Sequence, residues 1–171
     1  MFNLSRYGIT YISRLLIFSL LFISSGFHWV HAARVPSGTP LIIRMAETVS
    51  SKNCGIGKSV TGVVANDVVV DGVTVIKAGA TAVGRVTNAT KANLVGLPGS
   101  LTVNFESVLA VNGATVPLMN GDISADGTNN MVVAIVLGLL CILGFLIPGG
   151  DAVIGSGSTI QALTIGEVQV N

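Results

Sequence analysis

Hydrophobic and polar residues alternate along most of the chain between residues 34 and 130, in short runs rich in Val, Ile and Thr. Such alternation places every second side chain on one face of a strand, and no long stretch here has the spacing of an amphipathic helix. Gly, Asn and Asp interrupt the runs at short intervals, as turns between strands do. The pattern predicts an all-β fold, either a single β-sandwich or a partly closed β-barrel.

Two β-hairpins are indicated by their turn dipeptides. Asp71-Gly72 separates the apolar runs 68–70 and 73–75, and Asn112-Gly113 separates residues 108–111 from 114–118. A type I′ turn needs positive φ at both central residues, and Asp-Gly and Asn-Gly accept this conformation. We therefore expect a type I′ turn in each hairpin.

A short pattern occurs three times along the chain: a turn glycine, a small residue, and then alternating apolar positions. The copies cover residues 35–43, 76–84 and 154–162. Each is typical of a tight turn that starts a strand with one face inward. The third copy predicts that the end of the chain rejoins the β-domain. With the two hairpin turns, the predicted turn glycines are Gly38, Gly72, Gly79, Gly113 and Gly157.

Residues 131–147 form an apolar run without charge or amide, inserted before the third copy and followed by Pro148. One helix over this run would be about 26 Å long, slightly short of a hydrocarbon core of about 30 Å. Small residues on one helical face let another helix approach closely. We favour a membrane-associated helix, or a helical hairpin inserted from the exported side, over a pair of buried strands. The small residues near one face are Ala134, Gly138, Cys141 and Gly144.

The first 33 residues have the three parts of a secretory signal peptide. Arg6 and Arg14 are basic, residues 15–23 are apolar, and residues 30–33 end in small side chains suited to cleavage. All His, Tyr and Trp residues lie in this leader, so the mature chain would lack His and Tyr, and paired carboxylates would be the only common acid–base route left. We expect a non-enzymatic protein exported to the bacterial cell envelope, either periplasmic or associated with a membrane, the outer membrane included.

The overall charge of the chain does not indicate a partner bound by long-range electrostatic attraction. Removing Arg6 and Arg14 from the nine Lys and Arg residues leaves seven, against eight Asp and Glu. This balance argues against nucleic acid or anionic lipid held by overall charge. All seven remaining basic residues precede position 92.

No motif predicts a metal, a cofactor or a small-molecule substrate. Residues 54–59 lack the first glycine of a phosphate-binding loop, and the acidic residues at 122–126 match no calcium-loop spacing. Cys54 and Cys141 fit no metal site, and we favour free thiols over a disulfide between a polar loop and an apolar run.

The order of these signals resembles the C-terminal β-barrel domain of the TrbI-like family, the core-complex channel component of conjugation and type IV secretion systems. The resemblance spans most of residues 35–170 and implies a helical insertion that enters the outer membrane, in the place of residues 131–147. The chain is also similar to short bacterial envelope proteins with the same β-pattern. The matching segments are 38–41, 49–51, Gly57, 68–72, 76–79 with Gly84, 101–105, 112–113, 116–118 and 157–160.

The expected organisation follows from these signals. A cleaved signal peptide covers residues 1–33, a β-domain 34–130, a hydrophobic membrane-associated segment 131–147, and one or more rejoining strands 148–171. We expect a structural or assembly component tethered to a membrane, in a homo-oligomer or an envelope complex of the secretion or conjugation type. The alternative is a soluble periplasmic binding or adaptor module in which residues 131–147 are buried core.

Overall fold

The computed structural model of the chain describes residues 33–170. The described residues belong to one compact unit, Ala32–Asn171. The signal peptide predicted over residues 1–33 lies outside the described residues, apart from its last position. Strands make up 47% of the structure and helices 10%, and six strands form a closed barrel. The predicted all-β fold class is confirmed.

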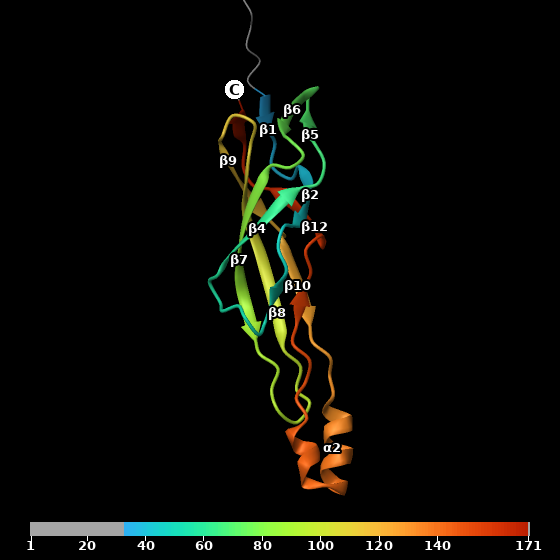
Figure 1. Cartoon of the computed structure of the whole chain (residues 1–171). Coiled ribbons are helices and arrows are strands. Elements are labelled where there is room, and N and C mark those ends of the chain that lie inside the picture. The colour runs from blue at the N-terminus through green and yellow to red at the C-terminus, as the bar shows by residue number, and fades with distance from the viewer. Residues whose placement is uncertain (1–32, 171) are drawn as a thin grey trace, which may run out of the picture. The chain divides into compact units, whose positions relative to one another are not determined.

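The elements follow one another along the chain as labelled in Figure 1. They are β1 Ala33–Val35, β2 Pro40–Met45, β3 Val49–Ser50, β4 Ser59–Val64, β5 Val68–Val70, β6 Val73–Ile76, β7 Thr81–Thr90, β8 Ser100–Leu109, β9 Thr115–Met119, β10 Asp122–Asp126, the α-helix α2 Met131–Leu140, the 3-10 helix η1 Ile142–Leu146, β11 Val153–Ile154, β12 Thr159–Thr164 and β13 Val168–Val170.

Six antiparallel strands close the barrel in the order β8-β7-β4-β2-β12-β9. β12 pairs with β2 from Thr159 opposite Arg44 to Leu163 opposite Pro40, so the end of the chain lies beside its beginning. The second half of β8 pairs with β9 and closes the ring. Its first half pairs with β10, so β7, β8 and β10 continue as a three-stranded sheet toward α2 (Figure 1).

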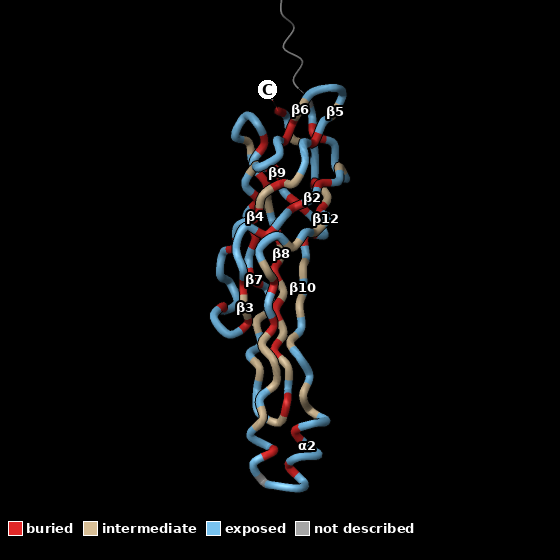
Figure 2. Tube along the Cα trace, turned by 45° about the vertical axis from the view of Figure 1, so that its right-hand side comes forward, coloured by how far each residue is buried: buried red, intermediate tan, exposed pale blue. Residues whose placement is uncertain are grey.

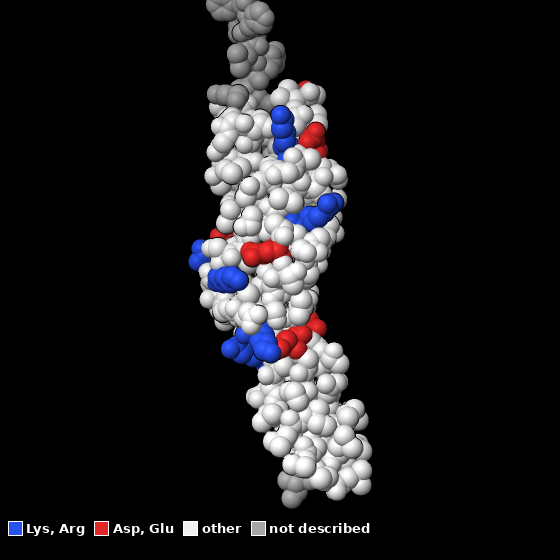
Figure 3. Space-filling model, viewed as in Figure 1, with Lys and Arg blue, Asp and Glu red and all other residues white. Residues whose placement is uncertain are grey.

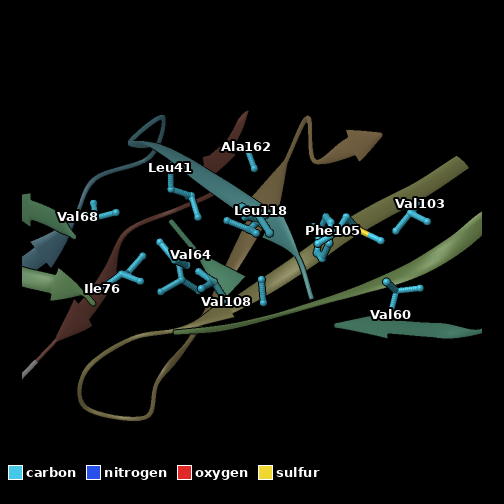
Figure 4. Close-up of a cluster of buried hydrophobic side chains, with 14 of the residues drawn as sticks. Leu41, Val60, Val64, Val68, Ile76, Val103, Phe105, Val108, Leu118 and Ala162 are labelled. Carbon is cyan, nitrogen blue, oxygen red and sulfur yellow. The ribbon is translucent and has the colours of Figure 1, made fainter. Parts of the chain in front are cut away.

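The barrel core follows from the alternation seen in the sequence. Along β2 and the first part of β7, exposed and buried residues alternate one by one (Figure 2). Phe105 of β8 is completely buried among the apolar side chains of the barrel (Figure 4). A Cβ atom on Gly62 would lie 2.7 Å from Cε1 of Phe105, and one on Gly84 would lie 2.9 Å from its Cδ1. Glycines on β4 and β7 therefore leave the space that the aromatic ring occupies.

The three sequence copies form the same turn, each at the start of a barrel strand. In each turn the glycine N–H donates to the last carbonyl of a neighbouring strand, and that strand residue's N–H donates back to the carbonyl that follows the glycine. The pairs are Gly38 with Thr164 (2.8 Å) and back to Thr39 (3.1 Å), Gly79 with Val64 (2.8 Å) and back to Ala80 (2.9 Å), and Gly157 with Met45 (2.9 Å) and back to Ser158 (2.8 Å).

The two hairpin turns differ from each other. Asp71 and Gly72 have φ of 52° and 79°, as a type I′ turn requires. The type I′ prediction is wrong for the other hairpin, where only Gly113 has positive φ, at 82°. There the Gly113 N–H donates to the Ala110 carbonyl at 3.0 Å, and the Asn112 Oδ1 accepts the Ala114 N–H at 3.0 Å. The turn is one residue longer, so Asn112 keeps an ordinary backbone conformation.

Residues 131–147 are not one helix, and that expectation is corrected. α2 ends at Leu140, Cys141 is extended with φ −152° and ψ 126°, and η1 runs back beside α2. The loop after β7 donates hydrogen bonds to the carbonyls of Phe145 and Ile147, which hold the returning arm in place. Among residues 33–170, none of the helices combines the length and the apolar character needed to cross a membrane.

We expect Gly62→Ala to lower the free energy of unfolding by about 1–3 kcal/mol, because the new methyl group overpacks the barrel against Phe105 and Ile43. Chemical denaturation of the full chain measures this change. The matched control is Gly55→Ala, where no atom lies within 4 Å of the added carbon. That control should change stability by less than about 1 kcal/mol, and equal losses in the two variants would contradict the proposed fit of the ring.

Candidate functional site

Exposed apolar side chains cover the hairpin formed by α2 and η1. Leu139 and Leu140 are each 80% exposed, and Val132 is 75% exposed. The interpretation of residues 131–147 as buried core strands is therefore wrong, because the run is helical and most of its residues are exposed (Figure 2). The remaining exposed apolar residues of the hairpin are Val133, Ile135, Val136, Leu137, Leu143, Phe145 and Leu146.

The predicted small-residue face lies mostly inside this hairpin. Ala134 and Gly138 are buried, and a Cβ atom on Gly138 would lie 2.7 Å from Cζ of Phe145. Gly144 lies against the backbone of Gly138, whereas Cys141 is exposed at the break. The η1 arm of the same chain thus packs against the small-residue face of α2. Helix packing between two molecules through this face stays a prediction, and it would require η1 to move away.

Backbone hydrogen bonds from the loop after β7 fix the hairpin. The Val95 N–H donates to the Phe145 carbonyl at 3.2 Å, and the Gly96 N–H donates to the Ile147 carbonyl at 2.9 Å. The Gly96 carbonyl in turn accepts the Asn130 N–H at 3.0 Å. Gly96 has φ 70°, and a Cβ atom there would overlap the backbone at Asn130, so only glycine allows this approach.

We call residues 92–99 and 127–150 the tip, and the tip contains no Asp, Glu, Lys or Arg. Figure 3 shows an uncharged surface at the α2 end of the described unit, with the nearest charged side chains at its boundary. Hydrogen bonds join the chain segments at this boundary: Ala92 N–H to Asp151 Oδ1 (3.4 Å), Gly99 N–H to the Gly150 carbonyl (2.9 Å) and Gly127 N–H to the Gly99 carbonyl (2.8 Å).

The polar side chains of the tip bond to its own backbone. Asn129 Oδ1 accepts the Met131 N–H at 3.0 Å, Asn93 Oδ1 accepts the Leu94 N–H at 2.8 Å, and Asn130 Nδ2 donates to the Pro148 carbonyl at 3.3 Å. An unsatisfied backbone group costs several kcal/mol where water is excluded. The tip can therefore leave water with much of its backbone polarity already satisfied.

The other side chains that could carry chemistry do not gather in one site. Cys54 and Cys141 are free, the first buried and the second exposed. Lys58 Nζ donates to Cys54 Sγ at 3.4 Å, and Asp122 Oδ1 accepts from Asn104 Nδ2 at 2.8 Å. Within the described part of the chain, no three His, Cys, Asp or Glu residues are placed to hold a metal ion.

The predicted turn glycines have positive φ and lie in turns outside the tip. Their φ angles are 84° for Gly38, 79° for Gly72, 83° for Gly79, 82° for Gly113 and 87° for Gly157. They shape the strand connections, whereas the candidate surface at the tip also includes residues 92–99. Sequence reasoning missed that loop, although its lack of charge was a signal shared with residues 127–150.

Fold and site together define an all-β barrel domain with an exposed apolar helical tip. No protein-family model matches the chain, and no curated protein matches its sequence. Solved structures with a similar fold include ComB10 of the Com type IV secretion system of Helicobacter pylori, at 13% sequence identity and a TM-score of 0.44. The match covers 80% of this chain and 89% of that chain, and it concerns the fold alone.

We expect Gly138→Leu to open the hairpin, because the larger side chain displaces the Phe145 ring from α2. Amide hydrogen exchange at Val95 and Gly96 should then be roughly tenfold faster, since their acceptors lie on and just after the displaced η1 arm. Amides of β8 serve as an internal reference. The control Val136→Leu enlarges an exposed residue of the same helix. Unchanged exchange in Gly138→Leu would show that the contact with Phe145 does not hold the hairpin closed.

Proposed function

We propose that this protein is a non-enzymatic structural component of the bacterial cell envelope and that its tip attaches it to a lipid membrane. The observation that carries the proposal is the uncharged tip with its exposed helical hairpin, including Leu139 and Leu140. Contiguous apolar surfaces of this kind mark sites that bind a membrane or another protein.

The distribution of exposed side chains around α2 favours lipid over a protein groove. A helix that docks in a groove presents one apolar stripe and keeps a polar face toward water. α2 has no polar face, because its exposed positions are apolar throughout and only Ala134 and Gly138 are buried in the hairpin. A solvent that is apolar on all sides fits this helix better than a single groove does.

The length of the hairpin supports insertion into one leaflet. α2 covers Met131–Leu140 and is about 15 Å long at 1.5 Å per residue, roughly half of a hydrocarbon core of about 30 Å. Each exposed Val or Leu side chain that passes fully from water into lipid gains about 1.5–3 kcal/mol. Several such side chains would hold the protein at a membrane surface without crossing it.

We further propose that the protein works as part of an assembly of envelope proteins. The leader sequence supports export, and the resemblance to the TrbI-like β-barrel domain supports a place in a secretion- or conjugation-type envelope complex. In such a complex the barrel would contact neighbouring copies or other envelope proteins, and the tip would hold the assembly at the membrane. Cross-linking of the full chain in its native envelope should capture these neighbours, and capture of the monomer alone would contradict the assembly role.

We expect Leu139→Asp combined with Leu140→Asp to weaken binding of the full chain to lipid vesicles at least tenfold, because each carboxylate opposes entry into hydrocarbon by about 2.5–3.5 kcal/mol. Vesicle flotation measures the bound fraction. The matched control is Val69→Asp with Val73→Asp, two exposed residues of the β5 and β6 hairpin outside the tip (Figure 1). Any contribution of the leader is common to both variants, so equal binding would contradict attachment through the tip.

A further inference from the structure

Two lysines at the boundary of the tip have no carboxylate partner. Among residues 33–170 the ion pairs are Arg34 with Glu167 and Arg85 with Glu106, each at 3.5 Å. Neither pair includes Lys52 or Lys91. Both ammonium groups are thus available to bind an external anion.

The fold brings these two lysines to the same level, although they are far apart in the sequence. Ser51, next to Lys52, is buried and accepts the Ala152 N–H at 3.0 Å. A Cβ atom on Gly99 would lie 2.7 Å from Ser51 Oγ and 2.8 Å from the carbonyl of Thr90, the residue before Lys91. The backbone of both lysines therefore lies close to the boundary between the charged surface and the tip (Figure 3).

Among residues 33–170, the acidic residues of this boundary, Asp126 and Asp151, form no ion pair with either lysine. Asp126 lies on β10, and Ser100 of β8 separates it from Thr90 of β7, so the two edges are roughly 10 Å apart by strand spacing. Asp151 accepts the Ala92 N–H through its Oδ1. The near-neutral overall charge predicted no electrostatic attraction to lipid, but attraction at short range depends on local charges, because salt screens the rest within about 10 Å.

We propose that Lys52 and Lys91 bind the phosphate groups of anionic lipids when the tip is inserted. This inference rests on the proposed function, to which it adds the class of lipid and the depth of insertion. With the α2–η1 hairpin in hydrocarbon, the rest of the tip and its boundary face the headgroups, where a lysine ammonium on its flexible apolar stem reaches a phosphate. Each such lysine strengthens binding to an anionic surface roughly fivefold.

The experiment compares the full chain with Lys52→Gln combined with Lys91→Gln. The probes are vesicles of phosphatidylcholine and vesicles of phosphatidylcholine mixed with phosphatidylglycerol. We expect the double variant to bind the mixed vesicles roughly 25-fold more weakly than the unmodified chain, and to bind phosphatidylcholine vesicles equally well. Molar salt should remove most of the difference.

The matched control is Lys77→Gln combined with Arg44→Gln, which removes the same charge outside the tip and its boundary from two residues that form no ion pair among residues 33–170. It should keep nearly full preference for the mixed vesicles. Equal losses in the two double variants, or no loss in either, would overturn the lysine proposal while leaving insertion of the tip intact. Failure of the unmodified chain to bind any vesicle would instead overturn the proposed function, and would direct attention to a protein partner for the tip.

Discussion

The fit of the Phe105 ring inside the barrel is the contact on which the rest of the structure depends. The ring fills the space left by Gly62 on β4 and Gly84 on β7, and the Phe105 N–H donates to the Gly121 carbonyl at 2.9 Å. Phe105 also lies where β8 changes partner, since Asn104 pairs with β10 and Ser107 pairs with β9. One residue thus connects barrel closure with the sheet that extends beyond the barrel.

The three-stranded sheet that extends beyond the barrel explains how the domain keeps the exposed apolar tip in a fixed position. β7, β8 and β10 leave the closed ring together, and the loops at their ends bond to one another at the base of the tip. The tip itself has little core beyond Ala134, Gly138 and the ring of Phe145. Its position therefore depends on backbone hydrogen bonds to the 92–99 loop and, through that loop, on the barrel. Closure also removes the free strand edges of the barrel itself, whereas β10 remains an edge strand of the extension.

Much of this fold could be predicted from the sequence, because alternation and turn chemistry are local. The turns at Gly38, Gly79 and Gly157 and the β5–β6 hairpin follow from nearby residues. A partly closed barrel and a rejoining chain end were predicted, but the strand that the end of the chain would join was not, since β2 and β12 carry no local signal that they pair. The break at Cys141 could not be predicted either, because Leu, Ile and Val suit one long helix equally well, and the hydrogen bonds that Val95 and Gly96 donate to the returning arm come from a loop far away in the sequence. Lys52 and Lys91 come to the same boundary only through the tertiary fold.

The central claim is that a rigid barrel presents a helical tip to one leaflet of a membrane. Cys141 offers the most direct test, because its thiol is exposed at the end of the tip whereas Cys54 is buried. A nitroxide attached to Cys141 of the full chain reports its depth in lipid vesicles through collisions with oxygen and with a water-soluble relaxant. The account predicts a label within the hydrocarbon of one leaflet, shielded from the water-soluble relaxant. A label that stays in water when the protein is bound to vesicles would contradict it.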